Sequence, residues 1–342
     1  MARNLSDPCY KTPMKHALVT GGCGFLGSSI VRSLLERKVR VRVLALPSER
    51  TDNVDGLDVE VVRGDVTSPD DCARAVKGVD TVFHAAAIYK AWMPDPSLMY
   101  EVNSRGTFHM LEASRRGGVK TVVYTASIVA LGRPPAGTLG DESTEYKVWK
   151  LDFPYSRAKY HSRVIAESFA QWGMDVRIVC PGIVFGPRDI APTPSGKLII
   201  ESVKGSGPPV VVDGGASYVD VRDAAEVHVL AAEKGKPGEK YLATAHNLSN
   251  QDFLDAIGRA IGKVRRYYRL PVPAARAIIH ATNVVAEKTG TEPPLTEEFF
   301  EYSLVPSYFR NDKARHALGA TFRPIEDSIR DAVAYFRTTG QL

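Results

Sequence analysis

Three polar side chains near the middle of the chain are of types that together can move a proton. Tyr155 and Lys159 are four residues apart in a segment with helical spacing, so both project from one face of the expected helix. A tyrosine with a pKa of about 10 is a poor base at neutral pH, but a neighbouring ammonium stabilises the phenolate and lowers that pKa. Ser127 ends an expected strand, where its hydroxyl can orient a substrate oxygen. The set suits reversible oxidation of an alcohol; the competing interpretation is an amphipathic helix with a surface lysine.

A glycine-rich loop follows the first expected strand, at 16–20. Its pattern is Gly21-x-x-Gly24-x-x-Gly27, and a segment with helical spacing comes directly after it. Glycines let a phosphate approach the backbone, and the N-terminus of the following helix supplies N–H donors. The alternative is a tight turn that packs the helix closely on the strand. The position of the loop at the start of a strand–helix alternation favours cofactor binding.

Expected strands and helices alternate over the first half of the chain. Such alternation is typical of a parallel sheet covered by helices on both faces. Right-handed crossovers then give a doubly wound α/β fold, a Rossmann sheet. The strands are expected at 16–20, 39–46, 59–63, 80–86, 119–127 and 176–179, with helices at 71–76, 99–116 and 155–172.

The alternation ends after Pro181, where prolines and glycines crowd a loop-rich region. Further helices are expected at 221–234, 250–261 and 325–336, the second with a capping box between Ser249 and Asp252. We infer a smaller, mainly helical C-terminal substrate lobe over the carboxyl ends of the strands, where ligands bind in such sheets. The predicted division is a flexible extension at 1–14, a dinucleotide-binding domain at 15–182 to which 211–262 returns in part, a substrate-binding lobe at 183–210 and 264–312, and C-terminal helices at 313–342.

The composition argues against several classes of protein. The 342 residues suffice for about two domains. Basic residues exceed acidic ones by only 44 − 39 = 5, so no nucleic-acid partner is expected. We find neither the apolar core of a signal peptide nor an uncharged apolar stretch of about 18 residues, and we expect a cytoplasmic protein without a membrane span. Scattered cysteines and histidines predict neither a disulfide framework nor a metal site: Cys9, Cys23, Cys72, Cys180, His16, His84, His161 and His228.

Several motifs occur in a characteristic order along residues 15–190. They are Thr20–Gly27, Gly64-Asp65-Val66, His84-Ala85-Ala86-Ala87, Asn103-x-x-Gly106-Thr107, Ser127, Tyr155-x-x-x-Lys159 and Pro181–Pro187. In this the chain resembles the short-chain dehydrogenase/reductase superfamily in its extended form. The resemblance implies an NAD(P)-dependent enzyme acting on CH–OH groups, and a homodimer formed through helices 99–116 and 155–172.

The same resemblance implies roles for individual residues. Lys159 would bond the nicotinamide ribose. Asn103 would kink the fourth helix and relay protons, with a plain polar helix residue as the alternative. Asp65 would contact the adenine, with a turn residue as the alternative. The backbone from Pro181 to Val184 would face the carboxamide. The predicted cofactor contacts are Gly21, Gly24, Phe25, Leu26, Gly27, Ser48, Arg50, Asp65, Val66, Ala85, Ala86, Ala87, Tyr155, Lys159, Pro181, Ile183 and Val184.

The end of the second strand bears on the choice between NAD and NADP. An acidic group there favours NAD and a basic group favours the phosphate of NADP, but the strand ends at Leu46, which is neither. Ser48 and Arg50 follow and can hold a phosphate, whereas Glu49 opposes it. Reductases of the dihydroflavonol type carry Arg where Leu46 stands. On balance we lean to NADP over NAD.

Aromatic and apolar residues cluster in sequence near the expected site and predict a hydrophobic substrate. The alternative is ordinary packing of the lobe. Dehydratases of the superfamily carry an Asp-Glu pair directly after the serine, where this chain has Ile128-Val129, so dehydration is disfavoured. Sugar-nucleotide enzymes often carry an Arg at the position of Ala216. The loss of that guanidinium removes a bidentate contact to a diphosphate. The predicted substrate contacts are Tyr89, Trp92, Met93, Tyr146 and Trp149.

Two more local resemblances refine the substrate class. Residues 185–189 and 303–336 resemble 3β-hydroxysteroid and sterol dehydrogenases, including decarboxylating ones. The Tyr89-x-x-Trp92 region and residues 192–196 resemble bacterial hopanoid-cluster proteins named as sugar epimerases. We therefore expect interconversion of a secondary alcohol and a ketone on a bulky substrate such as a 3-hydroxysterol, where oxidation could be followed by C4 decarboxylation. The alternatives are a sugar-nucleotide epimerase and a non-catalytic nicotinamide sensor. Residues 272–289 are mildly amphipathic, and a lobe helix is favoured there over a lid or peripheral membrane contact.

The acid/base assignment can be tested at Tyr155. Tyr155→Phe should preserve cofactor binding and lower turnover by roughly 10²–10⁴-fold, because one positioned acid/base group contributes that much. Nicotinamide absorbance and a cofactor titration measure the two effects separately. Full activity in the variant would contradict the assignment.

Overall fold

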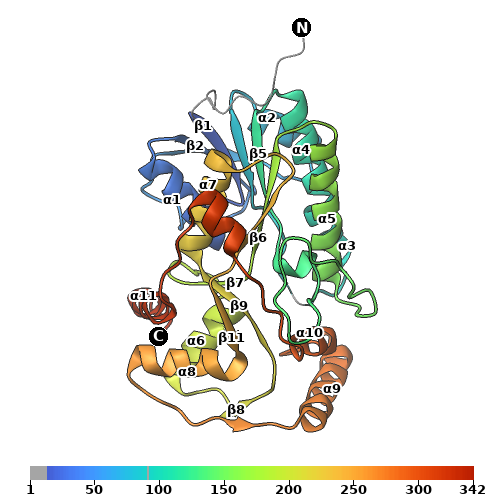
Figure 1. Cartoon of the computed structure of the whole chain (residues 1–342), viewed down its shortest axis with the longest axis vertical. Helices are drawn as coiled ribbons and strands as arrows, with labels where there is room; N and C mark the ends of the chain where they lie inside the picture. Colours follow the sequence, from blue (N-terminus) through green and yellow to red (C-terminus); the bar gives the residue numbers. More distant parts are fainter. Residues whose placement is uncertain (1–13, 91) are drawn as a thin grey trace.

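The computed structural model describes residues 14–90 and 92–342, and its main feature is a seven-stranded sheet (Figure 1). All neighbouring strands in this sheet run parallel. The expected extension, with Cys9, lies outside the described residues except for Met14. In spatial order the strands are β10 (Lys240–Ala243), β6 (Val176–Pro181), β5 (Thr121–Thr125), β4 (Thr81–His84), β1 (His16–Thr20), β2 (Arg40–Ala45) and β3 (Val59–Arg63).

Helices cover both faces of the sheet, and every residue of the strands β4 and β6 is therefore buried. One face packs against α1 (Phe25–Glu36), α7 (Val221–Lys234) and the π-helical turn η3 (Ala314–Leu318). The other packs against α2 (Pro69–Ala75), α4 (Gly106–Arg116) and α5 (Pro154–Gln171). Shorter helical elements are α3 (Ser97–Tyr100), the π-helical turn η1 (Glu101–Arg105) and the 3₁₀ turn η2 (Ile128–Ala130).

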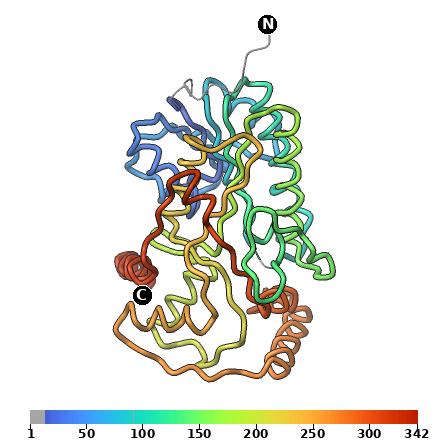
Figure 2. The backbone as a smooth tube through the Cα atoms, in the orientation of Figure 1, coloured from blue at the N-terminus to red at the C-terminus, as the bar shows by residue number. Residues whose placement is uncertain are grey.

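After β6 the chain leaves the sheet and builds a lobe below its carboxyl edge (Figures 1 and 2). The lobe contains a three-stranded sheet of β11 (His246–Ser249), β9 (Gly215–Asp220) and β7 (Ile183–Phe185). Around it lie α6 (Pro194–Lys204), α8 (Asn250–Ile261) and α11 (Ile325–Thr338), which bury Phe185, Phe253 and Phe336 in a common core. The remaining elements are the paired strands β8 (Val210–Val211) and β12 (Tyr268–Arg269), with α9 (Val272–Thr289) and α10 (Glu297–Ser303).

The doubly wound α/β fold is confirmed, and the expected strands and helices of the first half occur within a few residues of their predicted ends. The predicted capping box is also present, because the Ser249 hydroxyl and the Asp252 carboxylate each bond the other residue's backbone. The expected helix at 99–116 is interrupted by η1.

The description of the lobe as mainly helical was incomplete, because β7, β9 and β11 form a small sheet there and β10 returns to the main sheet. These strands are three to six residues long, too short for a clear alternation of apolar and polar side chains. Among the described residues, no helix combines the length and apolarity needed to cross a bilayer. The predicted domain boundaries stay a prediction.

Candidate active site

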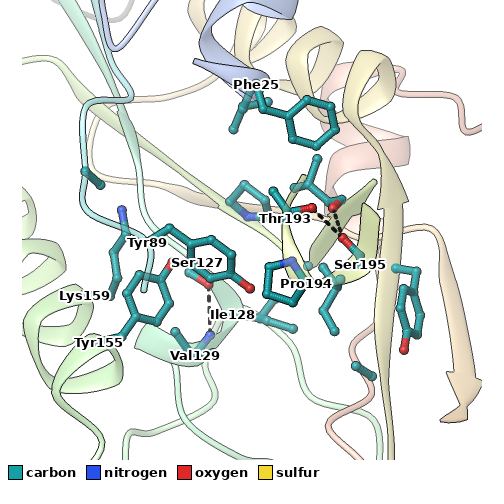
Figure 3. Close-up of a pocket in the computed structure, with 18 of the residues that line it drawn as sticks. Phe25, Tyr89, Ser127, Ile128, Val129, Tyr155, Lys159, Thr193, Pro194 and Ser195 are labelled. Atoms are coloured by element: carbon teal, nitrogen blue, oxygen red, sulfur yellow. Dashed lines mark hydrogen bonds between the residues drawn. The ribbon is translucent and has the colours of Figure 1, made fainter. Parts of the chain in front are cut away.

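A cavity of about 580 Å³ lies between the carboxyl edge of the sheet and the lobe. The glycine loop, the ends of β4, β5 and β6, and the N-terminal half of α5 form its upper wall. Residues from α6, β9, α8 and α10 form its lower wall. Figure 3 shows Tyr155, Lys159 and Ser127 grouped on one side and Phe25 and Thr193–Ser195 on the other. The cavity is therefore bounded by both halves of the chain.

The glycine loop packs closely against α1 and the end of β4 only because two positions carry no side chain. Gly21 has φ +67°, and a Cβ there would lie 2.9 Å from the Cα of Ala86. A Cβ on Gly27 would lie 2.0 Å from the carbonyl oxygen of Gly21. Gly24 is the N-cap of α1 and makes no side-chain cap, so the N–H groups of the first turn face the cavity. This cradle fits a dinucleotide diphosphate.

Cys23 lies within the same loop but does not suit thiol chemistry. Its side chain is buried, and burial raises the pKa of the thiol to about 11. The thiol therefore stays protonated at neutral pH, and the residue acts as a small filler of the loop.

Ser127, Tyr155 and Lys159 all line the cavity, as the sequence predicts. Lys159 is positioned by its Nζ, which donates a hydrogen bond of 3.0 Å to the carbonyl oxygen of Thr125 at the end of β5. Ser127 is the N-cap of η2, and its Oγ accepts from the backbone N–H of Val129 at 3.4 Å (Figure 3). The end of β5 and the first turns of α5 thus bring the three side chains together.

Burial, rather than a neighbouring charge, dominates the electrostatics of this set. It raises the pKa of Tyr155 above the ordinary value; the Tyr89 phenol adds to the rise, and a hydrogen bond with Ser127 opposes it. The pKa of Lys159 is lowered by burial to about 8. Burial outweighs any lowering of the Tyr155 pKa by Lys159, and the expectation that Lys159 stabilises the phenolate stays a prediction. A phenol that keeps its proton is suited to donate it to a carbonyl oxygen.

Asn103 is buried but does not line the cavity. It lies in the π-helical turn η1, where its Oδ1 accepts from the N–H of Ile88 at 2.7 Å and its Nδ2 donates to the carbonyl of Ile88 at 3.0 Å. Both ends of the amide thus hold the segment that leads to Tyr89. Its direct role in proton relay stays a prediction, whereas its contacts are those of a positioning residue.

The predicted cofactor contacts divide into two groups. Thirteen of them line the cavity, but Ser48, Arg50, Asp65 and Val66 do not. Arg50 is instead paired with Asp52 at 2.7 Å on the surface, and Asp65 accepts from the N–H of Thr67 at 2.8 Å, the turn contact that was its alternative. The thirteen are Gly21, Gly24, Phe25, Leu26, Gly27, Ala85, Ala86, Ala87, Tyr155, Lys159, Pro181, Ile183 and Val184.

Glu49, which the sequence analysis set against a phosphate, takes the place of Ser48 and Arg50 in the wall. Its Oε2 accepts from the N–H of Leu46 at 3.0 Å, which holds the carboxylate just beyond β2. The guanidinium of Arg63 caps the same loop, donating to the carbonyl oxygens of Leu46 and Glu49 at 2.9 and 2.7 Å. The loop after β2 therefore presents a carboxylate to the cavity.

Of the predicted substrate contacts, the structure brings only Tyr89 into the cavity wall. Its ring lies 5.0 Å from that of Tyr155, and about half of its surface stays accessible because it faces the cavity. Tyr146 and Trp149 instead pack against one another and against Tyr160 on the outer side of α5. Trp92 and Met93 lie outside the wall, with Met93 packed against a neighbouring apolar cluster.

Apart from Ala216, the lower wall of the cavity consists of residues for which the sequence gives no prediction. Tyr218 and Phe253 stack with ring centroids 4.1 Å apart, and Phe299 and Tyr302 come from α10. Among the described residues that line the cavity, Lys159 is the one cation and Glu49 the one carboxylate. No local motif marks these positions, because they converge from β9, α8 and α10. They are Phe153, Leu198, Ala216, Tyr218, Asn250, Phe253, Phe299, Tyr302, Ser303, Val305 and Ser307.

A parallel doubly wound sheet with a bare glycine loop, and a serine, tyrosine and lysine gathered at its carboxyl edge, is the architecture of the extended short-chain dehydrogenases/reductases. The model of the "NAD dependent epimerase/dehydratase family" matches residues 17–243. The chain belongs to this family and is an NAD(P)-dependent oxidoreductase.

Full-length relatives agree with this assignment. The chain is 33% identical to a "Putative dihydroflavonol 4-reductase" of Synechocystis over 94% of both chains. It is 30% identical to "Sterol demethylase protein B" of Methylococcus capsulatus over 95% of this chain and 99% of the other. The crystal structure of gox2253 superposes with a TM-score of 0.85 at 35% identity, over 96% of this chain and 99% of that one.

The ionisation of Lys159 predicts a pH dependence. With a pKa of about 8, the ammonium is present below that pH and is lost above it, so kcat/KM for ketone reduction should fall as the pH rises past about 8. Rates measured from pH 6.5 to 10 test this. Unfolding does not explain such a fall, because a lysine pKa lowered from 10.5 makes its own contribution to stability rise with pH between about 8 and 10.5. A constant kcat/KM throughout, in protein shown to be folded, would contradict the assignment.

Proposed function

We propose that the protein interconverts a secondary alcohol and a ketone on a bulky hydrophobic substrate, with sterols and other polycyclic isoprenoids as the favoured class. The apolar lower wall carries this proposal. Tyr218, Phe253, Phe299 and Tyr302 offer flat surfaces to a fused-ring skeleton. A sugar nucleotide would bring a diphosphate into a part of the cavity that has no guanidinium among its described lining residues.

The names of two relatives support the same class, since one is named for sterol demethylation and the other for a flavonoid reductase. Both names refer to fused-ring or aromatic substrates rather than to sugars. If the substrate is a sterol with a carboxyl group at C4, oxidation of the 3-hydroxyl leaves a β-keto acid, which loses carbon dioxide readily. We propose this decarboxylation as a consequence of the oxidation that needs no further catalytic group.

The chain's own residues divide the work of the reaction. The Ser127 hydroxyl orients the substrate oxygen, and Tyr155 donates a proton to it during reduction or removes one during oxidation. Lys159 is held by the Thr125 carbonyl beside Tyr155 and would also bond the cofactor ribose. The bound nicotinamide supplies or accepts the hydride. The glycine loop would hold the diphosphate, and the backbone at Pro181–Val184 would hold the carboxamide.

We also propose that Glu49 directs the enzyme to NAD rather than to NADP, which reverses the preference that the sequence favours. A carboxylate at the end of the second strand accepts hydrogen bonds from ribose hydroxyls and repels a 2′-phosphate. Glu49 lies in the cavity wall, whereas Arg50 is engaged by Asp52 outside it. Arg63 lies close by, and its Nη1 donates to two backbone carbonyls of the loop, which holds the guanidinium against the backbone.

A homodimer remains part of the proposal. Phe108 and Val164 are large apolar side chains left 42% and 37% exposed on α4 and α5, the helices expected to form the contact. Burial of these side chains against a second copy is a sufficient reason for association.

Replacement of Glu49 tests the cofactor preference. Glu49→Gln keeps an oxygen for the Leu46 N–H but removes the charge, so the ratio of kcat/KM with NADPH to that with NADH should rise at least about tenfold. Asp55→Asn, an exposed change in the same loop region, serves as the matched control and should leave the ratio unchanged. Equal responses of the two variants would refute the role of Glu49.

A substrate screen tests the reaction itself. Purified protein is assayed by nicotinamide absorbance with 3-hydroxysteroids, C4-carboxylated sterols, flavanonols and sugar nucleotides, with both cofactors and with Tyr155→Phe as the blank. We expect turnover of the hydrophobic alcohols or their ketones and none of the sugar nucleotides. Epimerisation of a sugar nucleotide by protein that retains tightly bound NAD would establish the alternative function.

A further inference from the structure

The helix α9 leaves large apolar side chains exposed beside its polar ones. Two of its polar residues are engaged by neighbouring segments: Arg276 pairs with Glu301 at 2.6 Å on the surface, and Asn283 donates to the carbonyl of Leu295 at 2.8 Å. Its outward side carries Ile278 and Val285, which are 55% and 59% exposed. An amphipathic helix normally turns its apolar stripe to the core. Here part of that stripe faces outward, and a single-chain fold does not explain it.

The segment before α9 also carries exposed apolar side chains, and it adds positive charge. Val264 is 81% exposed and Tyr268 63% exposed. Residues 262–286 contain five lysines and arginines and no aspartate or glutamate, whereas the whole chain has a nearly balanced charge. One of the five, Arg269, is paired with Asp213 and another, Arg276, with Glu301. In Figure 1 β8 and α9 lie at the end of the molecule farthest from the N-terminus.

A second, apolar cavity lies beside the active-site cavity, on the side of α9. It has a volume of about 290 Å³ and shares Leu198, Tyr218, Asn250, Phe253 and Ser303 with the wall of the active-site cavity. On its other side it is lined by Val210 and Ile278, which are exposed on the outer surface. Apolar side chains therefore line a route from the α9 surface towards Tyr218 and Phe253.

We propose that this surface, formed by residues 263–269 and the outward side of α9, binds the face of a bilayer that contains anionic lipids. The second cavity is then the entrance through which a membrane-dissolved substrate reaches the active site. Apolar side chains flanked by arginines and lysines bind such an interface by burial and by attraction to the headgroups. A second copy of the chain is a poorer partner, because a two-fold contact would bring the same basic residues together. The statement about substrate entry rests on the proposed function, whereas the binding of lipid does not.

Vesicle sedimentation tests the surface directly. The full-length protein should sediment with vesicles of equimolar phosphatidylglycerol and phosphatidylcholine, more weakly with phosphatidylcholine alone, and less as sodium chloride is added. Lys263→Glu with Arg266→Glu should weaken the partition at least about tenfold, because two attractive charges become repulsive. The matched control is Lys77→Glu with Lys120→Glu, which changes the net charge equally on exposed residues at the opposite end of the molecule. The control should bind like the unmodified protein.

The apolar contribution has its own variant, Val264→Ser with Val285→Ser, which should also weaken binding while leaving activity on a short water-soluble ketone unchanged. Loss of binding in both control and test pairs, or no binding by the unmodified protein, would overturn the proposal. So would a change from dimer to monomer by light scattering in the serine variant without any vesicle binding, because the surface would then be an interface between copies.

The role of the surface in substrate entry is measured with a sterol carried in the vesicles. Both surface variants should lose at least about tenfold in the rate with the vesicle-borne sterol, and neither should lose rate with the short soluble ketone. Equal rates with the vesicle-borne sterol in variants that no longer bind vesicles would overturn the entrance. If no redox substrate is found at all, the proposed function fails. Vesicle sedimentation of the Tyr155→Phe protein and of the surface variants still decides whether the surface binds lipid.

Discussion

The close approach of Gly27 to the carbonyl oxygen of Gly21 is the constraint on which the cofactor half of the molecule depends. A side-chain carbon at Gly27 would overlap that oxygen, at 2.0 Å, so any other residue must push α1 away from β1. Because the two glycines meet, the first turn of α1 opens into the cavity at the carboxyl edge of the sheet. Tyr155, Lys159 and Ser127 reach the same edge from α5 and β5. The close packing of the backbone at the glycine loop therefore sets where the site lies, and the three side chains supply its chemistry.

Within that site, burial drives both ionisable groups of the central pair towards their neutral forms. The pKa of the phenol rises and that of the amine falls, so the chain by itself holds Tyr155 as an acid and Lys159 close to its titration point. This places the pair nearer to proton donation than to proton removal. The cavity carries little charge as well, since its described lining residues include one cation, Lys159, and one carboxylate, Glu49.

The lobe supplies the lower wall of the active-site cavity, which the substrate would contact. Its aromatic rings come from β9, α8 and α10, and the second cavity extends their apolar surface to the outward side of α9. The proposed hydrophobic substrate and the proposed lipid-binding surface would follow from one arrangement, because a substrate that prefers the aromatic wall also prefers a bilayer to water. The polar contacts of α9 with Glu301 and Leu295 fix the helix so that its apolar residues remain available outside.

The sequence by itself determined the doubly wound sheet, the glycine loop, and the trio of Ser127, Tyr155 and Lys159, because each depends on local periodicity or on residues close together in one motif. It did not determine the substrate wall: Tyr146 and Trp149 precede the catalytic helix in sequence, yet they pack on its outer side, whereas Phe253 and Tyr302 reach the cavity from remote segments. It also could not decide between Glu49 and Arg50, which are adjacent in the chain and differ in that one side chain bonds back to Leu46 and the other turns to Asp52. Contacts between distant segments, and the direction of a side chain in a loop, depend on packing between parts of the chain that are far apart in the sequence. Only the tertiary structure determines them.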